Sequence, residues 1–303
     1  MISSLLKFFR LCPLLIMSAG LYLTCSGDWP HSHGAYKNYQ RIISFAPSIT
    51  ETLFALSCGK NVVGVTAFCT YPAQVRHLPK VGGYIDPNFE MIIRLKPDLV
   101  IMLKEHEQLK DFLKLNGIDY LLVDNHNLEA IIGSILQIGT VCGKPKQADS
   151  LVSQIKNECI QHVTKQDNPP RVFLCADRDV RGSGAISRVF AAGKSTFYSD
   201  LLEATGLQNA LRSENLEYPQ LSAEGIMQLQ PDIIIDLSMR TGSPVLDGGI
   251  KDWAALADIP AIKNNMVFCL NGDFMTIPGP RVFLILKEFK KINYLYRSAM
   301  RKE

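Results

Sequence analysis

The chain lacks the short signatures of several common catalytic and metal-binding sites. Its eight cysteines include no Cys-x-x-Cys pair, so a zinc ribbon or a thioredoxin-type redox motif has no support. Neither Gly-x-Ser-x-Gly nor His-Glu-x-x-His occurs, which removes the usual signatures of serine hydrolases and zinc proteases. His77, His106, His126 and His162 are scattered along the chain, whereas a free-metal site needs several converging ligands. The sequence therefore predicts no metal site and no catalytic residue.

A nucleotide-binding loop is also missing. Gly193-Lys194-Ser195-Thr196 resembles the end of a P-loop, but that motif needs a glycine five residues earlier so that backbone amides can surround phosphate. Arg188 occupies that position here. We expect no nucleotide at this segment.

The chain carries almost no net charge and few tryptophans. The chain has 32 basic and 29 acidic residues, and loss of Lys7 and Arg10 with a leader peptide would leave a net charge of +1. This balance gives no reason to expect nucleic-acid binding, which usually shows a concentrated basic surface. Trp29 and Trp253 are the only tryptophans.

The N-terminus has the layout of a secretory signal over residues 1–24. Lys7 and Arg10 precede an apolar stretch, residues 11–23, that is short for a membrane span, and no acidic residue occurs before Asp28. An uncleaved N-terminal anchor is the alternative. Leu23-Thr24-Cys25 resembles a lipobox, although Leu23 is larger than usual at that position, so Cys25 is the expected lipidation site.

Export and lipidation would give the mature chain a defined location. Residues 25–40 are then a polar tether, and the protein lies in the periplasm or at the cell surface. Such a compartment permits disulfides. The sequence leaves open whether the six cysteines beyond Cys25 form pairs.

One sequence unit occurs twice, 134 positions apart. Glu90-Met-Ile-Ile-Arg-Leu-Lys-Pro-Asp-Leu-Val-Ile returns as Glu224-Gly-Ile-Met-Gln-Leu-Gln-Pro-Asp-Ile-Ile-Ile, with six of twelve positions identical. Each copy predicts a short amphipathic helix with its glutamate at the positive end of the helix dipole. Proline then ends the helix, and the apolar run is typical of a strand buried on both faces of a parallel sheet. The duplication predicts two similar α/β lobes with a ligand site between them.

The alternation of strand and helix patterns predicts an α/β fold, with two Rossmann-like lobes that contain parallel sheets and are joined by a single long helix. Arg41 to Phe45 reads as the first strand, and Ser48 or Thr50 as the N-cap of the following helix. Apolar positions recur every three or four residues from Lys146 to Thr164. We therefore divide the body into an N-terminal lobe (41–144), a connecting helix (145–170) and a C-terminal lobe (171–303).

Several of these segments together resemble a known family. They are Ala46-Pro47-Ser48-Ile49-Thr50-Glu51, Val63-Gly64-Val65-Thr66, Tyr71-Pro72, the two Pro-Asp units and Tyr218-Pro219-Gln220-Leu221-Ser222. They are similar to segments of the class III periplasmic solute-binding proteins of ABC importers for cobalamin, haem and ferric siderophores. The resemblance runs from Arg41 to Leu295 and is nearest to the cobalamin-binding member.

The resemblance implies partners and site residues. In the family, an acidic residue on each lobe pairs with arginines of the membrane permease, and these positions fall on Glu90 and Glu224. The other expected partners are the importer's ATPase and a small-molecule ligand; we expect a monomer with no cofactor. Family positions that contact ligand fall on four aromatic residues and one acidic residue: Phe68, Tyr84, Tyr218, Phe274 and Asp273.

The match to the cobalamin-binding member is imperfect at the ligand positions. Three of its tryptophans are replaced by Tyr84, Tyr218 and Phe274, and another by Leu103. Haem or a ferric siderophore is therefore an alternative ligand. Arginine suits carboxylate or phosphate recognition, so Arg181, Arg188 and Arg281 are further candidates, although Arg281 is expected to be structural at the start of the last helix. The sequence thus predicts an exported binding protein; a chelatase-type enzyme on the same fold is the rival hypothesis.

Overall fold

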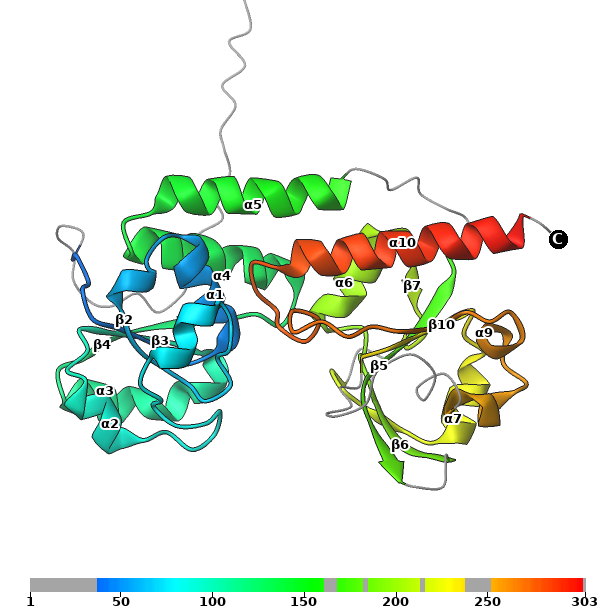
Figure 1. The fold of residues 1–303 in the computed structure, drawn as a ribbon, viewed down its shortest axis with the longest axis horizontal. Coiled ribbons are helices and arrows are strands. Elements are labelled where there is room, and N and C mark those ends of the chain that lie inside the picture. Colours follow the sequence, from blue (N-terminus) through cyan, green and yellow to red (C-terminus); the bar gives the residue numbers. More distant parts are fainter. Residues whose placement is uncertain (1–36, 161–167, 182–184, 213–215, 238–251, 302–303) are drawn as a thin grey trace, which may run out of the picture.

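The computed structural model describes residues 37–160, 168–181, 185–212, 216–237 and 252–301. Two α/β lobes lie side by side, and long helices run along one side of both (Figure 1). The expected signal peptide and most of the tether, including Cys25, lie outside the described residues. Within the described part, no helix has both the length and the hydropathy needed to cross a bilayer.

The N-terminal lobe is built on a four-stranded parallel sheet in the order β2-β1-β3-β4. Its central strand β3 is buried at all five positions, as expected for an apolar run covered on both faces. The strands are β1 (Ile42–Ser44), β2 (Val62–Val65), β3 (Leu99–Leu103) and β4 (Asp119–Val123). The helices are α1 (Pro47–Ala55), α2 (Phe89–Arg94), α3 (Lys110–Leu115) and α4 (Leu128–Val141), with 3₁₀ turns η1 (Gly59–Asn61), η2 (Ala73–His77) and η3 (Lys104–Leu109).

The C-terminal lobe contains a mixed sheet, so the expectation of a second parallel sheet was only partly right. The order is β10-β9-β5-β6-β8, with β7 paired to β5; β6 runs antiparallel to both of its neighbours. Three residues separate β5 from β6, too few for the crossover that a parallel pair requires. The strands are β5 (Arg171–Arg181), β6 (Ala185–Ala191), β7 (Gln208–Asn209), β8 (Gln220–Leu221), β9 (Ile233–Asp236) and β10 (Val267–Cys269).

Helices cover both faces of this sheet: α6 and α10 pack on the face shared with α5 (Pro145–Ile160), and α7 and α9 pack on the other face (Figure 1). They are α6 (Phe197–Ala204), α7 (Ala223–Leu229), α9 (Pro260–Lys263) and α10 (Val282–Met300), with the 3₁₀ turn η4 (Ala254–Leu256). The expected connecting helix is α5, which begins one residue before the apolar periodicity that starts at Lys146; residues 161–167 are outside the described part.

The duplicated unit folds the same way in both lobes. Helices α2 and α7 are capped by Asn88 and Ser222, whose side chains accept hydrogen bonds from the backbone of the first turn. Each helix is followed by a left-handed residue directly before the proline: Lys96 has φ 47° and Gln230 has φ 43°. A left-handed residue is a common way to end a helix, and a following proline disfavours continued α conformation.

The aspartate of each Pro-Asp pair anchors the neighbouring strand. Asp98 accepts a hydrogen bond from the backbone N–H of Arg41 (2.9 Å) and donates its own N–H to the carbonyl of Arg41 (3.0 Å). In the other lobe, Asp232 makes the same two contacts with Arg171, both at 2.8 Å. The repeat therefore fixes the position at which the first strand of each lobe, β1 or β5, begins.

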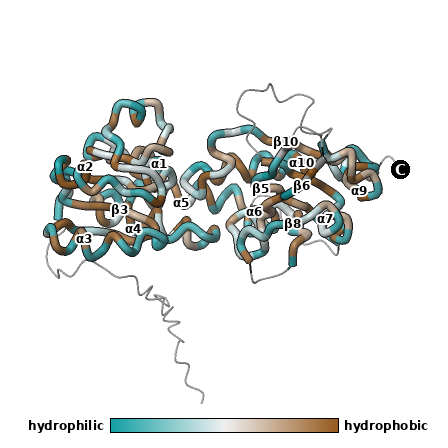
Figure 2. Tube along the Cα trace, turned by 90° about the horizontal axis from the view of Figure 1, so that it is seen from below, coloured by the Kyte–Doolittle hydropathy of each residue, from teal (hydrophilic) through white to brown (hydrophobic). Residues whose placement is uncertain are grey.

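A continuous hydrophobic cluster joins the lobes along the helical side. It contains buried side chains of both sheets together with α4, α5, α6 and α10, among them Ile155 and Phe289. Helix α5 packs against α4 and α10, and Lys290 of α10 pairs with Glu158 of α5 at 3.1 Å. The opposite face of each sheet has a separate apolar cluster. Figure 2, in which each residue is coloured by hydropathy, shows that strands such as β3 consist largely of hydrophobic residues.

A buried cluster of charged side chains lies on strands β5 and β9 of the C-terminal sheet. Arg178 on β5 donates to Asp236 (2.7 Å) and to Asp252 (2.9 Å), and the indole of Trp253 also donates to Asp236 (2.9 Å). The Arg178 side chain is 1% exposed. Burial lowers the pKa of Arg178, but the two carboxylates outweigh this effect and raise it. This cluster ties β5 and β9 to the segment that precedes η4.

Replacing Arg178 with alanine should destabilise the protein by about 3–5 kcal/mol, because two carboxylates would stay buried without their cation. Urea unfolding followed by circular dichroism measures the loss. Arg188→Ala is the matched control: it removes an exposed cross-strand pair with Asp179 (3.0 Å) on the same hairpin and should change stability by less than about 1 kcal/mol. Equal effects of the two substitutions would contradict this account of the cluster.

Candidate ligand-binding site

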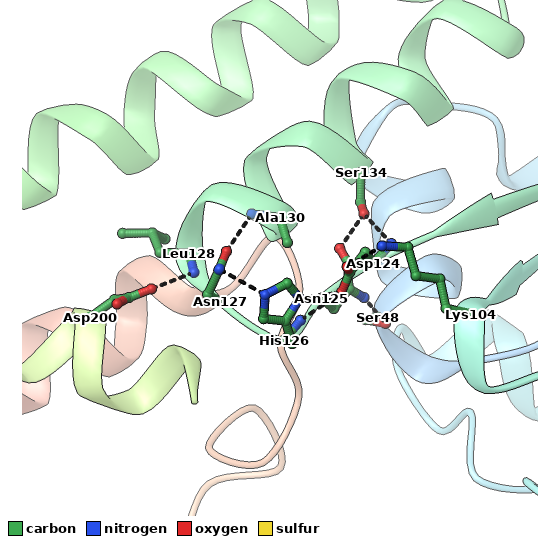
Figure 3. Close-up of polar contacts among 10 residues, drawn as sticks. All are labelled: Ser48, Lys104, Asp124, Asn125, His126, Asn127, Leu128, Ala130, Ser134 and Asp200. Carbon is green, nitrogen blue, oxygen red and sulfur yellow. Dashed lines mark hydrogen bonds and ion pairs between the residues drawn. The ribbon is translucent and has the colours of Figure 1, made fainter. Parts of the chain in front are cut away.

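Polar side chains gather at the carboxyl ends of the parallel strands in the N-terminal lobe. Asp124 follows β4 and accepts hydrogen bonds from Lys104 Nζ (2.7 Å) and His126 Nδ1 (2.6 Å) (Figure 3). Asn125 donates to Ser48 Oγ at 2.7 Å, which links this loop to α1. In open parallel sheets, ligands bind outside this edge.

The charge of Asp124 is held by its neighbours. Burial would raise the pKa of Asp124, but the hydrogen bonds from Lys104 and His126 lower it to about 2. Ser134 of α4 fixes the same loop, because its hydroxyl donates to the Asp124 carbonyl (2.6 Å) and accepts from the Asp124 N–H (3.1 Å). The loop after β4 is therefore held in place and presents polar groups at this edge of the sheet, which we call the polar edge.

The same loop leads directly to the other lobe. Asn127 caps α4 by accepting from Ala130 N (2.7 Å), and its amide lies 2.9 Å from His126 Nε2. Asp200 of α6 accepts from Leu128 N at 2.8 Å (Figure 3). A carboxylate from the C-terminal lobe thus lies at the positive end of an N-terminal-lobe helix, where negative charge is stabilised.

A second contact between the lobes centres on Arg281, just before α10. Its guanidinium donates to both carboxylate oxygens of Glu51 on α1, at 2.5 and 2.8 Å, and to Asp273 at 2.9 Å. It also stacks over the ring of Tyr71 at 3.9 Å and lies 5.8 Å from the Phe274 ring centroid. Burial raises the pKa of Glu51, and the hydrogen bonds from Arg281 oppose that shift. The expected structural role of Arg281 agrees with these contacts.

The predicted aromatic residues occupy exposed loops of both lobes. Phe68 and Tyr84 lie between β2 and α2 and are 61% and 37% exposed, while Tyr218 lies just before β8 and is 44% exposed. The Tyr84 ring packs edge-on against His106, with ring centroids 4.7 Å apart. Partial burial, with Glu217 nearby, raises the pKa of Tyr218 to about 12, so its hydroxyl stays protonated at neutral pH.

The other predicted ligand residues have partners within the protein. Asp273 is paired with Arg281, and Phe274 lies beside it in the loop between β10 and α10. Tyr198 of α6 anchors this loop by donating to the Met275 carbonyl at 2.6 Å. Arg188 lies on β6 and pairs with Asp179, which places it on the hairpin rather than with Arg281.

Glu90 and Glu224 lie in the first turns of α2 and α7 and are exposed. A hydrogen bond with its own backbone N–H, and another with Ser222, lower the pKa of Glu224. The two residues therefore occupy equivalent positions in the two lobes.

Among the predicted ligand residues, Asp273 and Phe274 are adjacent in one loop, and Phe68 and Tyr84 share the segment between β2 and α2. Tyr218 lies before β8 and Arg188 lies on β6. Sequence reasoning missed Glu51 and Tyr71 as members of the Arg281 cluster, although both belong to segments that carried the family resemblance. Among the described residues, no three His, Cys, Asp or Glu side chains are arranged to hold a metal ion.

Comparison with known proteins decides the family. A family model described as periplasmic binding protein matches residues 42–273. The chain belongs to the periplasmic binding protein family. The ABC transporter substrate-binding lipoprotein YvrC of Bacillus subtilis is 32% identical over 269 residues, which cover 85% of this chain and 81% of that protein.

Two further relatives show the range of the family. The vitamin B12-binding protein of Pectobacterium atrosepticum is 27% identical over 267 residues, covering 84% of this chain and 88% of that protein. The solved apo structure of the periplasmic haem-binding protein RhuT from Roseiflexus sp. RS-1 has a TM-score of 0.68 and 26% identity, and covers 85% of this chain and 98% of that one.

These matches confirm the family and the two-lobed fold that the sequence predicted. This periplasmic binding protein is a substrate-binding component of an ABC importer and not an enzyme. Proteins of this kind carry a transported ligand rather than a cofactor, and they work with a membrane permease and an ATPase. The chelatase-type alternative is therefore wrong.

The polar edge at Asp124 predicts an acid-dependent loss of stability. A carboxylate whose pKa is lowered by folding contributes stability above its unfolded value, and this contribution is lost as pH falls through the folded value of about 2. Between pH 4 and 2, the wild type should lose about 1–2 kcal/mol more than Asp124→Asn.

Urea unfolding at several pH values measures this difference. Asp149→Asn, a substitution on the exposed face of α5, is the control and should follow the wild type. Parallel pH profiles for the wild type and Asp124→Asn would disprove the role of Asp124.

Proposed function

We propose that this periplasmic binding protein is exported, anchored through a lipid on Cys25, and captures a metal-containing macrocycle or chelate between its lobes. Cobalamin is the leading ligand. The observation that carries the proposal is the presence of exposed aromatic side chains on loops of both lobes, at Phe68, Tyr84 and Tyr218. The relatives that bind vitamin B12 support it.

Aromatic side chains suit such a ligand for physical reasons. Each buries a large area and loses little conformational freedom, and a planar ring system offers a broad apolar face. Phe274 adds a further ring on the C-terminal side, in a loop held by Arg281 and Tyr198. The polar edge at Asp124 and Lys104 supplies hydrogen-bonding groups next to α1.

Haem or a ferric siderophore is the second candidate. The tryptophans of the cobalamin-binding member are replaced here by Tyr84, Tyr218 and Phe274, which changes the shape of the aromatic surface without removing it. Tyrosine is also an established haem ligand, and both tyrosines are partly exposed. The haem-binding relative supports this alternative.

Docking to the permease would use Glu90 and Glu224. Both carboxylates are exposed at the starts of equivalent helices, one on each lobe. Charges placed in this way set the register and rate of association more than the affinity. The proposed arrangement directs one carboxylate from each lobe toward arginines of the permease.

Ligand identity is tested by titrating the purified protein with cyanocobalamin, haemin and a ferric siderophore, followed by calorimetry and visible absorbance. We expect stoichiometric binding of cyanocobalamin. Tyr84→Ala combined with Tyr218→Ala should weaken binding at least tenfold, because two ring contacts are lost. Arg94→Ala, an exposed change on α2, is the control. Binding of haemin alone would replace cobalamin with haem; binding of none of the three would overturn the proposal.

Docking is tested by Glu90→Ala combined with Glu224→Ala. Transport into reconstituted vesicles should fall severalfold, while ligand affinity stays unchanged because neither residue belongs to the proposed ligand surface. Glu129→Ala combined with Glu203→Ala removes one exposed carboxylate from a helix of each lobe and should leave transport intact. A loss of ligand affinity in the first variant would rule out a docking role.

A further inference from the structure

A buried histidine packs directly against the exposed ring of Tyr84. His106 lies within the 3₁₀ turn η3, where its backbone leaves the helical region with φ −97° and ψ 18°, and it is 2% exposed. Its ring meets two aromatic rings edge-on, that of Phe45 with centroids 5.2 Å apart and that of Tyr84 at 4.7 Å. A residue of the protein interior therefore reaches the back of a candidate ligand residue.

The two nitrogens of the His106 ring have different surroundings. Nε2 lies 2.8 Å from the backbone carbonyl of Tyr84, and because a carbonyl oxygen can only accept, Nε2 carries the proton and donates it. Nδ1 is buried and makes no hydrogen bond to any of the described residues. Buried polar atoms usually have a partner, so an unpartnered nitrogen next to a candidate ligand loop needs an explanation.

Tyr84 projects from a tight turn over residues 82–87, which we call the Tyr84 turn. The base of the turn is closed by backbone pairing, in which the N–H of Gly83 donates to the Asp86 carbonyl at 3.2 Å. At its tip, His106 contacts Tyr84 twice, through the backbone carbonyl and through the ring. The direction in which the exposed Tyr84 ring points is therefore linked to the position of the His106 side chain.

The surroundings favour a neutral His106 ring. Burial lowers the pKa of His106, and the hydrogen bond to Tyr84, the charge of Glu105 and the carbonyl of Leu103 oppose this only in part. Burial, with Glu105 nearby, also raises the pKa of Tyr84, so its phenol stays protonated. The remaining charged side chains of the neighbouring elements lie in the Tyr84 turn, on η3, on α3 and after β4: Asp86, Lys104, Glu107, Lys110, Asp111, Lys114 and Asp124.

We propose that His106 is a positioning residue of the ligand surface: its neutral ring holds the Tyr84 turn in place, and its protonation releases the turn and weakens ligand capture. A proton added at Nδ1 would put a charge beside the buried ring of Phe45 without a hydrogen bond to stabilise it, which is costly. The protonated ring therefore leaves its pocket, and the contact with the Tyr84 carbonyl is lost. The inference rests on the proposed function, because it takes Tyr84 as a ligand residue.

NMR of the ligand-free protein tests the link between the two side chains. Histidine and tyrosine rings are labelled with ¹³C, and the two resonances are assigned with His106→Gln and Tyr84→Phe. Between pH 7.5 and 5.0, the His106 resonance should titrate with a midpoint below the ordinary value of about 6.5, and the Tyr84 resonance should shift with the same midpoint. In His106→Gln the Tyr84 resonance should stay constant. His77→Asn removes an exposed histidine of η2 and should behave as the wild type.

Calorimetry with cyanocobalamin at pH 7.5 and 5.0 tests the effect on capture. The wild type and His77→Asn should bind about 3–10-fold more weakly at pH 5.0, because binding selects the neutral ring. His106→Gln keeps an N–H donor without a titrating ring, so it should bind within about twofold of the wild type at pH 7.5 and lose nothing at pH 5.0. His106→Leu lacks the donor and should bind weakly at both pH values.

The two measurements separate this inference from the ligand assignment. If cyanocobalamin fails to bind the wild type at pH 7.5, the proposed ligand is wrong, and the NMR titrations alone decide whether His106 controls Tyr84. Unlinked titrations of the two rings would refute the inference. A pH dependence of binding that persists in His106→Gln would refute it as well, since another group would then be responsible.

Discussion

The ion pair between Glu51 and Arg281 joins the two lobes through residues that are 230 positions apart in the chain. The Glu51 side chain is 2% exposed, so its charge is tolerated only because a guanidinium faces both carboxylate oxygens. Because Arg281 also holds Asp273 and lies on the ring of Tyr71, the same contact positions the loop that carries Phe274. A connection between lobes and a part of the candidate ligand surface therefore share one residue.

The duplicated unit explains which structural features the two lobes share. Each lobe has the same short helix, helix end and aspartate contact, and the lobes differ outside this unit. In each copy, a left-handed residue and a proline end the helix, and the following aspartate accepts a hydrogen bond from the backbone at the start of the adjacent strand. The unit thus places a helix start, with Glu90 or Glu224, at a fixed position relative to a sheet. Outside the unit the constraint is lost, and β6 turns back antiparallel in one lobe only.

The sequence predicted those features that local chemistry determines. An apolar run after Pro-Asp indicated β3 and β9, and periodicity indicated α5. It misplaced the start of α1, where neither Ser48 nor Thr50 is the cap: Ala46 is the N-cap and Pro47, whose fixed φ suits the first turn, begins the helix. It also gave no sign that Glu51 would pair with Arg281, because each residue is ordinary within its own segment. The ligand residues stay predictions for the same reason, since their meeting depends on how distant loops are placed.

How the lobes are joined bears on how an importer would recognise this protein. Within one lobe, the Pro-Asp unit determines where the helix that carries the glutamate begins. The separation between Glu90 and Glu224, however, belongs to neither lobe alone, because it depends on the apolar layer of α4, α5, α6 and α10 and on the contacts of Arg281 and Asp200. A close-packed helical layer resists small displacements, since any shift leaves gaps or overlaps between side chains. The spacing of the two carboxylates is therefore determined by packing and ion pairs far from either carboxylate.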